Sequence, residues 1–576
     1  MVKTKEFVTN EIRNYVSPFI DVDEPLINTS DNLEKKRKNR RKRKSLWNKC
    51  KKEYRKKGKI AVIIFGLATL IIGIVLSSIP WLDYIILKHL RLWNGSLSYH
   101  YWQKPGVLRL TKVYIFNMTN PEEFLNLGEK PKLQEVGPFV YREDMEKVNV
   151  KFHDNGTVTF QHNKILKFVP EMSKPKDLKL TVPNIPLLSL STMSNSLGFF
   201  LQKTISVALS FGRYKPFINL TAEELVFGYD DTLVTLAHEF YPKHKKPNGK
   251  MGLLLGRNGT LNEISTIFTG ETSMEEFGYI DNVNGLRTLP YWKDAPCNNI
   301  RASEGSFFPP RYFSKDKEQI YYLYDKDVCR LIPLQYRKTE AKSGITVDLY
   351  TPADNMYESV ENYPENKCFC PGNEYCPPSG LQSIIPCHHD APIYASFPHF
   401  YKGDPHLLDQ IQGLSPSEKD HGSYIKIQPK LGVPLEALIR LQVNLKVERA
   451  PNVAVVSKFP SIILPLMWIE EGVTDLTPTI KRWIYLATTF ADVMNPLATY
   501  GSILVGTCIL VGVFINAYKS IMFTRDTIEM SMRTLRRGSN LIQSNNNRLL
   551  IIRDSYTLLN DVPETPDALD SPETFI

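Results

Sequence analysis

The sequence has 576 residues, of which 42% are apolar and 23% charged, with 71 Lys and Arg against 61 Asp and Glu. This composition excludes a chain that is disordered throughout, and 31 Gly with 39 Pro exclude a collagen-like or low-complexity fibre. Averages over the whole chain conceal two long uncharged segments, and these decide the class of protein.

The first uncharged segment covers residues 60–82 and would be about 34 Å long as a helix, against a hydrocarbon core of roughly 30 Å. The second covers residues 493–518 and contains three glycines, Gly501, Gly506 and Gly512, which membrane helices tolerate. We predict two transmembrane helices. The first is interpreted as a signal anchor and not as a cleaved signal peptide, because 59 residues precede it.

Charge next to these segments predicts their orientation. Residues 31–59 hold sixteen basic and three acidic side chains, and residues 519–537 hold five basic and two acidic ones. Cationic flanks stay in the cytosol, so we expect both termini inside. A nucleic-acid patch is the weaker interpretation of the basic segment, since the rest of the chain carries 55 basic and 58 acidic residues.

This topology divides the chain into five parts. We expect a cytosolic basic segment at 1–59, a span at 60–82, an extracellular or lumenal ectodomain at 83–492, a span at 493–518 and a cytosolic tail at 519–576.

Cysteines indicate that the ectodomain lies in an oxidising compartment. Six of the eight cysteines fall between positions 297 and 387, and an even number there predicts disulfides without choosing among fifteen pairings. Cys368 and Cys370 are too close in sequence to bridge comfortably, whereas Cys370 with Cys376 is favoured. A zinc site formed by these cysteines and residues 387–390 is the alternative, and we expect no metal or other cofactor.

Five Asn-x-Ser/Thr sequons in the ectodomain predict a glycoprotein. They begin at Asn94, Asn117, Asn155, Asn219 and Asn258. Asn28 also starts a sequon, but its cytosolic position predicts that it is unmodified.

Apolar residues that alternate with polar ones predict β-strands in the ectodomain. Residues 148–152 and 158–160 alternate around Asp154-Asn155-Gly156, which predicts a hairpin. Residues 439–447 alternate in the same way and predict a strand with one buried face, and residues 113–116 predict another strand. The expected body is an antiparallel sheet.

Helical patterns lie mainly between residues 187 and 237. Residues 197–211 form an apolar helix that is too short to span a bilayer, and Thr221 with Glu224 reads as a capping box that opens a further helix. Two interpretations of the apolar helix remain open. It either packs against the sheet or faces lipid, with Lys203, Arg213 and Lys215 offering cations to acidic head groups.

Motifs along the ectodomain resemble the class B scavenger receptor family. The resemblance begins with VYIFNMTNPEEFLNLGEKPKLQEVGPFVY at 113–141 and continues through ELVFGYDD, EGSFFPP, DVCRLIPL, NKCFC, PIYASFPHFY, IQGLSPSEKDHGSYIKIQP and RLQVNLKVE. These blocks follow one another in order from Trp93 to Ile469, between the two predicted spans. The chain resembles an insect-type, croquemort-like member. Its N-terminal segment is longer and more basic than is usual in that family, and its tail is also long.

The resemblance implies an α+β membrane protein, whose ectodomain has an antiparallel β-barrel-like core, an apical helical bundle and an internal tunnel. It also implies disulfides between Cys297 and Cys368, Cys329 and Cys387, and Cys370 and Cys376. The ligand-binding residues that it implies lie on and just after the apical helix. They are Phe199, Phe200, Lys203, Phe211, Arg213 and Lys215.

The function implied is that of a plasma-membrane scavenger receptor that binds lipids, lipoproteins or other anionic ligands and passes lipid through the tunnel. An endolysosomal receptor that sorts a protein cargo is the alternative. A two-span channel is disfavoured, because Ser502, Thr507 and Asn516 are too sparse for a pore stripe. Hydrolase and nucleotide-binding motifs are missing, so we expect no enzyme and no nucleic-acid partner.

Short cytosolic motifs suggest further partners. Asp554, Tyr556, Leu558 and Leu559 fit sorting-adaptor patterns, and residues 573–576 suit a PDZ-type groove. Cys50 lies ten residues before the first span and is a candidate for palmitoylation, with a free thiol as the alternative.

Overall fold

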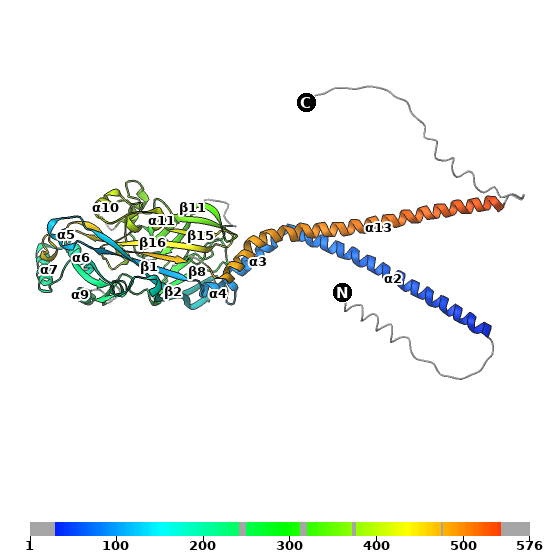
Figure 1. Cartoon of the computed structure of the whole chain (residues 1–576), viewed down its shortest axis with the longest axis horizontal. Helices are drawn as coiled ribbons and strands as arrows, with labels where there is room; N and C mark the ends of the chain where they lie inside the picture. Colours follow the sequence, from blue (N-terminus) through cyan, green and yellow to red (C-terminus); the bar gives the residue numbers. More distant parts are fainter. Residues whose placement is uncertain (1–28, 241–248, 312–319, 371–375, 474–475, 543–576) are drawn as a thin grey trace, which may run out of the picture. The chain divides into compact units, whose positions relative to one another are not determined.

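The computed structural model describes residues 29–240, 249–311, 320–370, 376–473 and 476–542. The chain separates into two compact units, one formed by residues 1–78 with 498–576 and the other by residues 79–497. Figure 1 shows the second unit as a body of strands and short helices.

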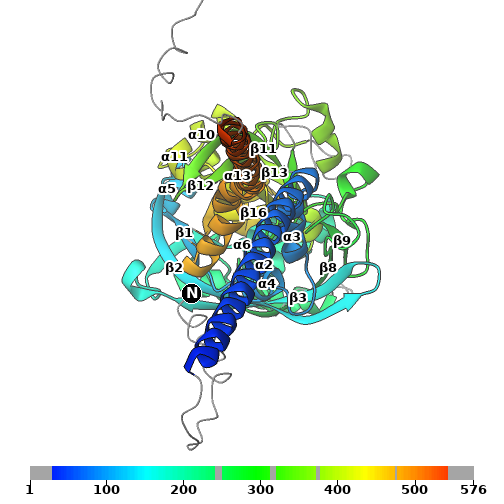
Figure 2. The ribbon, with the colours of Figure 1, turned by 90° about the vertical axis from the view of Figure 1, so that its right-hand side faces the viewer.

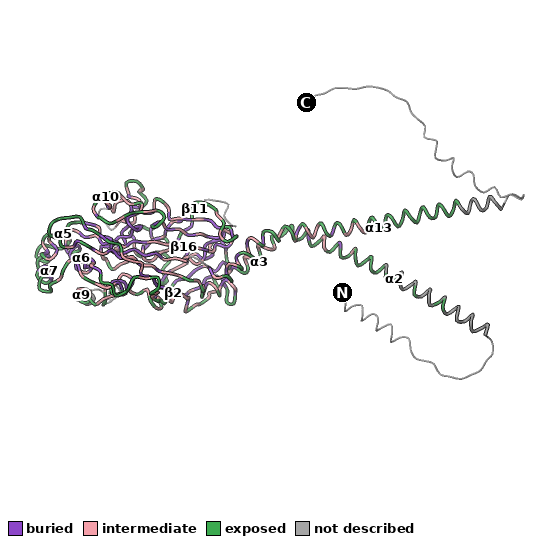
Figure 3. Tube along the Cα trace, in the orientation of Figure 1, coloured by how far each residue is buried: buried purple, intermediate pink, exposed green. Residues whose placement is uncertain are grey.

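Among the described residues, two helices are long and apolar enough to cross a membrane. They are α2 (Thr29–Ser78) and α13 (Ala491–Ile542), with apolar parts inside Lys56–Ser78 and Pro478–Arg533. Where the structure describes the burial of their side chains, most are exposed, as the green parts of the tube in Figure 3 show. Helix α2 ends at Ser78, so the last residues of the predicted span at 60–82 lie at the Pro80 break and in α3 (Trp81–Leu90).

Glycine allows α2 and α13 to approach each other closely. A Cβ atom on Gly506 would lie 2.7 Å from the backbone nitrogen of Leu70 and 3.0 Å from the carbonyl oxygen of Gly66. A side chain at position 506 would therefore push the two backbones apart. Gly501 and Gly512 have nothing within 4 Å of such an atom, so only Gly506 of the three predicted glycines serves this contact.

One large antiparallel sheet forms the centre of the second unit. Its hydrogen-bonded order is β10-β11-β12-β15-β16-β17-β1-β2-β3-β8-β9, and β13 and β14 join it through β16. Ser303 makes isolated bridges to Tyr279, next to β9, and to Leu323 in β10, which link the two ends of that order. In Figure 2 the strand labels accordingly run around the body, which gives the sheet a barrel-like form.

The bounds of the strands in this sheet are as follows. They are β1 (Arg109–Met118), β2 (Leu133–His153), β3 (Thr157–Phe168), β8 (Gly259–Phe268), β9 (Ile280–Val283), β10 (Tyr321–Asp325), β11 (Arg330–Lys342), β12 (Ile345–Pro352), β13 (Gln382–Ser383), β14 (Ile393–Ser396), β15 (Tyr424–Gln428), β16 (Val433–Val447) and β17 (Ile462–Val473). Two further pairs stand apart from it, β4 (Lys179–Pro183) with β5 (Phe217–Thr221) and β6 (Tyr229–Asp230) with β7 (Lys250–Met251).

Short helices gather at the two ends of the body in Figure 1. At one end lie α5 (Pro121–Leu127), α6 (Ile185–Ser194), α7 (Phe199–Phe211), α8 (Ala222–Phe227) and α9 (Thr232–Phe240). At the other end are α3 and α4 (Leu97–Gln103), together with α12 (Pro478–Tyr485), which continues through the π-helix η9 (Leu486–Phe490) into α13. The remaining helices, α10 (Pro405–Asp409) and α11 (Glu418–His421), lie along the side of the sheet.

Several local predictions are confirmed. The hairpin pairs β2 with β3 around residues 154–156, and the strand expected at 113–116 lies within β1. Thr221 caps α8 through a complete capping box, because its hydroxyl accepts from the Glu224 amide while the Glu224 carboxylate accepts from the Thr221 amide.

The prediction of one buried face for residues 439–447 is wrong. Gln442 and Asn444, which belong to the expected polar face of β16, are 0% exposed. The segment 393–400 covers them. The side-chain amide of Asn444 donates to the backbone carbonyl of Tyr394 at 3.2 Å, and the side-chain carbonyl of Gln442 accepts from the backbone amide of His399 at 2.7 Å. These hydrogen bonds to the second layer offset the cost of burying both side-chain amides.

Three disulfides fasten the loops beside the sheet. They join Cys297 to Cys368, Cys329 to Cys387 and Cys370 to Cys376, the same pairs that the resemblance implies. Because these six thiols are consumed, the zinc interpretation of the cysteine cluster is wrong. Phe369 lies between two of the cysteines. The centre of its ring is 3.7 Å from Cζ of Arg330, and the ring packs edge-on against Trp292.

Candidate functional site

Two large cavities lie inside the body. We call them distal and proximal by their place along the body, the distal cavity at the end with α6 and α9 and the proximal cavity at the end with α4 and α12. The distal cavity, about 410 Å³, is lined by α6, α9, residues 250–257, residues 384–393 and the strands β16 and β17. The proximal cavity, about 330 Å³, is lined by α4, α12 and strands from both ends of the sheet. Since α6 and α9 lie at one end of the body in Figure 1 and α4 at the other, the cavities follow one another along it.

The two cavities share five lining residues, which we call the neck. The neck consists of Arg257, Lys326, Asp327, Leu441 and Ile469. Apolar side chains form most of the remaining lining, including Leu190 and Met193 in the distal cavity and Ile425 and Ile480 in the proximal cavity. Volume and lining both fit sites that bind apolar small molecules.

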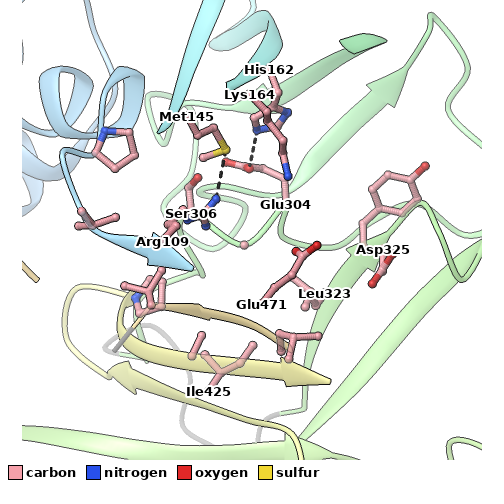
Figure 4. Close-up of a pocket in the computed structure, with 18 of the residues that line it drawn as sticks. Arg109, Met145, His162, Lys164, Glu304, Ser306, Leu323, Asp325, Ile425 and Glu471 are labelled. Atoms are coloured by element: carbon pink, nitrogen blue, oxygen red, sulfur yellow. Dashed lines mark hydrogen bonds and ion pairs between the residues drawn. The ribbon is translucent and has the colours of Figure 1, made fainter. Parts of the chain in front are cut away.

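Charged groups gather on one side of the proximal cavity. Figure 4 shows His162, Lys164 and Glu304 together there, with Ile425 on the opposite side. The side chain of Lys147, which does not line the cavity, is fully buried, and its ammonium donates to the Ser306 hydroxyl at 2.8 Å and the Trp102 carbonyl at 3.2 Å.

Lys147 and Glu304 form a buried ion pair, with 3.5 Å between Nζ and Oε1. Burial lowers the pKa of Lys147 to about 8 even though Glu304 favours its charged form. Burial alone would raise the pKa of Glu304, but Lys147 and His162 hold it well below its usual range. The carboxylate therefore stays ionised beside the cavity, and His162, whose pKa is lowered by burial, is neutral at physiological pH.

The predicted ligand-binding aromatic residues are strongly exposed on α7. Phe200 and Phe211 are each 85% exposed and Phe199 is 56% exposed. Lys203 lies over the Phe199 ring at 5.5 Å, and Arg213 and Lys215 are exposed just beyond the helix. The structure thus brings all six predicted residues to one end of the body, which Figure 3 shows as an exposed tube at α7.

The inward face of α7 is largely polar. Its buried residues are Gln202, Ser206 and Leu209, and the first two are fixed by hydrogen bonds. The side-chain amide of Asn452 donates to the side-chain carbonyl of Gln202 at 2.7 Å, and the backbone amide of Ala454 donates to the Ser206 hydroxyl at 2.8 Å. Of the two interpretations of this helix, the structure favours an apolar face turned to the solvent over one packed on the sheet.

The predicted sequons lie on the surface of the body with one exception. Asn94, Asn155, Asn219 and Asn258 are exposed, whereas Asn117 is half-buried and its carbonyl oxygen accepts from the Thr181 amide at 2.8 Å. The predicted sorting residues 554–559 and the sequon at Asn28 lie outside the described residues, as does the C-terminal motif. Cys50 belongs to α2.

One group within the described residues has the composition of a metal site, Glu135 with His399 and His421. The ring nitrogens argue against metal binding. The Nδ1 atoms of His399 and His421 accept from the Ser415 and Ser417 amides, at 3.0 and 2.9 Å. An Nδ1 atom that accepts an amide hydrogen has its lone pair occupied, so the ring proton lies on Nε2, and neither nitrogen has a lone pair for a metal. The His399 Nε2–H donates to Glu135, which also accepts from Trp468.

Sequence reasoning missed the neck and the buried ion pair. Arg257, Asp327 and Glu304 come from segments far apart in the chain, so no local spacing relates them. A weak signal was present in the motifs EGSFFPP and DVCRLIPL, where an acidic residue begins an otherwise mostly apolar block.

Comparison with known proteins identifies the family. Residues 62–517 match the family model described as the CD36 family. Scavenger receptor class B member 1 of Mus musculus is 33% identical over 388 residues, which cover 67% of this chain and 75% of the relative. The corresponding receptor of Bos taurus is 32% identical over 411 residues, 71% of this chain and 79% of the relative. Lysosome membrane protein 2 of Homo sapiens is 33% identical over 404 residues, 69% of this chain and 82% of the relative. With two candidate spans flanking a disulfide-bonded antiparallel body, this chain belongs to the CD36 family of class B scavenger receptors.

Proposed function

We propose that this protein is a cell-surface receptor that captures lipids or lipoproteins at α7 and passes lipid through its body to the membrane. The observation that carries the proposal is the pair of apolar cavities that share a neck. They extend from the end of the body that carries α6, α7 and α9 toward the end that carries α4 and α12. Both α4 and α12 are close in sequence to the two spans.

The physical task is to move an acyl chain without exposing it to water. Each methylene exposed on the way costs about 0.8 kcal/mol, so a chain of about fifteen methylenes would face a barrier of roughly 12 kcal/mol. An apolar passage removes most of that barrier without an input of chemical energy. The exposed apolar face of α7 supplies the capture surface, and Lys203, Arg213 and Lys215 add attraction for anionic particles.

The topology that suits this function keeps both termini in the cytosol and residues 83–492 outside the cell. The basic segment before α2 and the basic residues after position 518 support it. In this orientation the sequons and disulfides of the body lie in the secretory lumen or outside the cell, where both modifications form.

A transfer assay tests the proposed function. Cells that express the full chain are incubated with donor vesicles that carry a fluorescent lipid, and lipid that merely adheres is stripped before counting. We expect transfer severalfold above that of cells without the protein, at equal vesicle dose. Transfer equal to the background, with the protein present at the surface, would contradict the proposal.

A cargo-sorting receptor of endolysosomes is the second candidate, favoured by the similarity to lysosome membrane protein 2 and by the tail motif at Leu558 and Leu559. Imaging separates the two. A lysosomal pool that is lost on replacing both leucines by alanine supports the second candidate, whereas steady residence at the surface supports the first.

A further inference from the structure

A partly buried ion cluster lies at the neck between the cavities. Arg257 pairs through one guanidinium nitrogen with Asp327 and through the other with Glu471, which lines the proximal cavity. The three side chains come from the turn before β8, the turn after β10 and strand β17. Their side chains are 14%, 25% and 36% exposed, so Glu471 is the member that retains most contact with solvent.

The cluster is held in its charged form. Burial alone would lower the pKa of Arg257, but Asp327 and Glu471 raise it above its ordinary value. Burial alone would raise the pKa values of Asp327 and Glu471, and Arg257 lowers both. Removing one carboxylate therefore leaves Arg257 paired with the other and frees one of its guanidinium nitrogens for another anion.

Two of the five neck residues are apolar. Leu441 of β16 and Ile469 of β17 face each other in the sheet register, and both line both cavities. An amphiphile at this point would thus meet an apolar surface for its chain and an ion cluster for its head. A purely apolar passage would not contain a buried arginine that bridges two acids.

We propose that Arg257, Asp327 and Glu471 form a charge-selective latch, which an anionic head group opens by replacing Glu471 on Arg257. This inference rests on the proposed function. The exchange of one carboxylate for another keeps Arg257 paired throughout, and Glu471 is released toward the proximal cavity, where it is most accessible. A neutral head group offers no such partner, so its passage breaks a buried ion pair without replacement.

Arg257 is accordingly a residue that determines specificity, and the preferred cargo is a single-chain amphiphile with an anionic head. Lys326, also in the neck, and Lys164, in the proximal cavity, are further cations on the path of that head, and the acidic side chains of Glu263 and Asp325 line the same cavity.

A pair of probes that differ only in head charge tests the latch. A pyrene-labelled fatty acid and its methyl ester are offered in phosphatidylcholine vesicles to cells that express the full chain, and background from cells without the protein is subtracted. We expect the wild type to transfer the acid about tenfold better than the ester, and Arg257→Gln to bring the ratio close to one through loss of acid transfer.

Two further variants keep this test decisive if Arg257→Gln reaches the surface poorly. Glu471→Gln retains the Arg257–Asp327 pair, and it should transfer the acid at least as well as the wild type. Arg440→Gln is the matched control, because Arg440 pairs with Glu470 at 2.7 Å, is 9% exposed and lines neither cavity. Its acid-to-ester ratio should equal that of the wild type.

Different results overturn different statements. An unchanged ratio in Arg257→Gln, or loss of acid transfer in Glu471→Gln at normal surface abundance, overturns the latch while the conduit stands. Failure of the wild type to transfer either probe above background overturns the proposed function, and the latch with it.

Discussion

At the scale of single residues, His421 shows how burial fixes a protonation state. The ring is 5% exposed, stacks on His399 with centroids 4.3 Å apart, and accepts from the Ser417 amide through Nδ1. Burial lowers the pKa of His421 to about 4, and His399 contributes in the same direction against the opposing charges of Glu135 and Asp420. A proton on Nδ1 would also face the amide donor, which favours the neutral ring.

This pKa predicts how stability depends on pH. The folded pKa of His421 lies below the unfolded value of about 6.5, so its contribution is complete above pH 6.5 and falls as the pH drops toward 4. Allowing for screening by nearby solvent, we expect a loss of about 1 kcal/mol at pH 5. His421→Asn keeps an acceptor for Ser417 and should lose less stability between pH 7 and pH 5.

Thermal unfolding of the full-length protein in detergent at both pH values measures this effect. His406→Asn is the matched control, because His406 is exposed on α10. An equal shift of the melting temperature with pH in the wild type and in His421→Asn would show that another group controls the acid response.

At the scale of elements, alternating patterns located strands well and described their surroundings less well. The hairpin of β2 and β3 follows from local alternation and a turn sequence, both of which are properties of neighbouring residues. The burial of Gln442 and Asn444 could not be predicted, because the cover comes from residues 393–400, some 45 positions earlier in the chain. The same reason conceals the neck.

Helix α7 has its apolar side outward, and this arrangement leads to a prediction about capture. Replacing Phe200 and Phe211 by Asp should reduce binding of labelled vesicles about tenfold or more, since each side chain loses apolar contact with the particle. Stability should change little, because both residues are 85% exposed in the free protein.

Leu127→Asp provides the control, because Leu127 is a 73% exposed apolar residue on another helix, α5. Surface biotinylation corrects for abundance. Binding that is unaffected by the aspartate pair would remove α7 from the ligand site.

Replacement of Arg213 and Lys215 by Glu should in turn weaken capture of anionic vesicles more than of neutral ones.

At the scale of the whole molecule, two apolar segments, an even set of cysteines and a series of family motifs were enough to predict the architecture. The disulfide pairs required the resemblance, because spacing alone left Cys297, Cys329, Cys368 and Cys387 without assigned partners. The cavities were beyond sequence reasoning in physical terms: their walls combine α4, α6, α12 and strands far apart in the chain, from β1 to β17, so their size depends on packing between distant segments.

A blocked neck gives the most direct measurement of whether lipid passes through the body. Leu441 lines both cavities, and Leu441→Trp replaces its side chain by a much larger indole ring at their junction. Ile264→Trp is the matched control, because Ile264 is 42% exposed on β8 and lines neither cavity. With surface abundance and vesicle binding equal, we expect Leu441→Trp to reduce lipid transfer to background, whereas Ile264→Trp should not. Transfer through Leu441→Trp at the wild-type rate would contradict passage of lipid through the body.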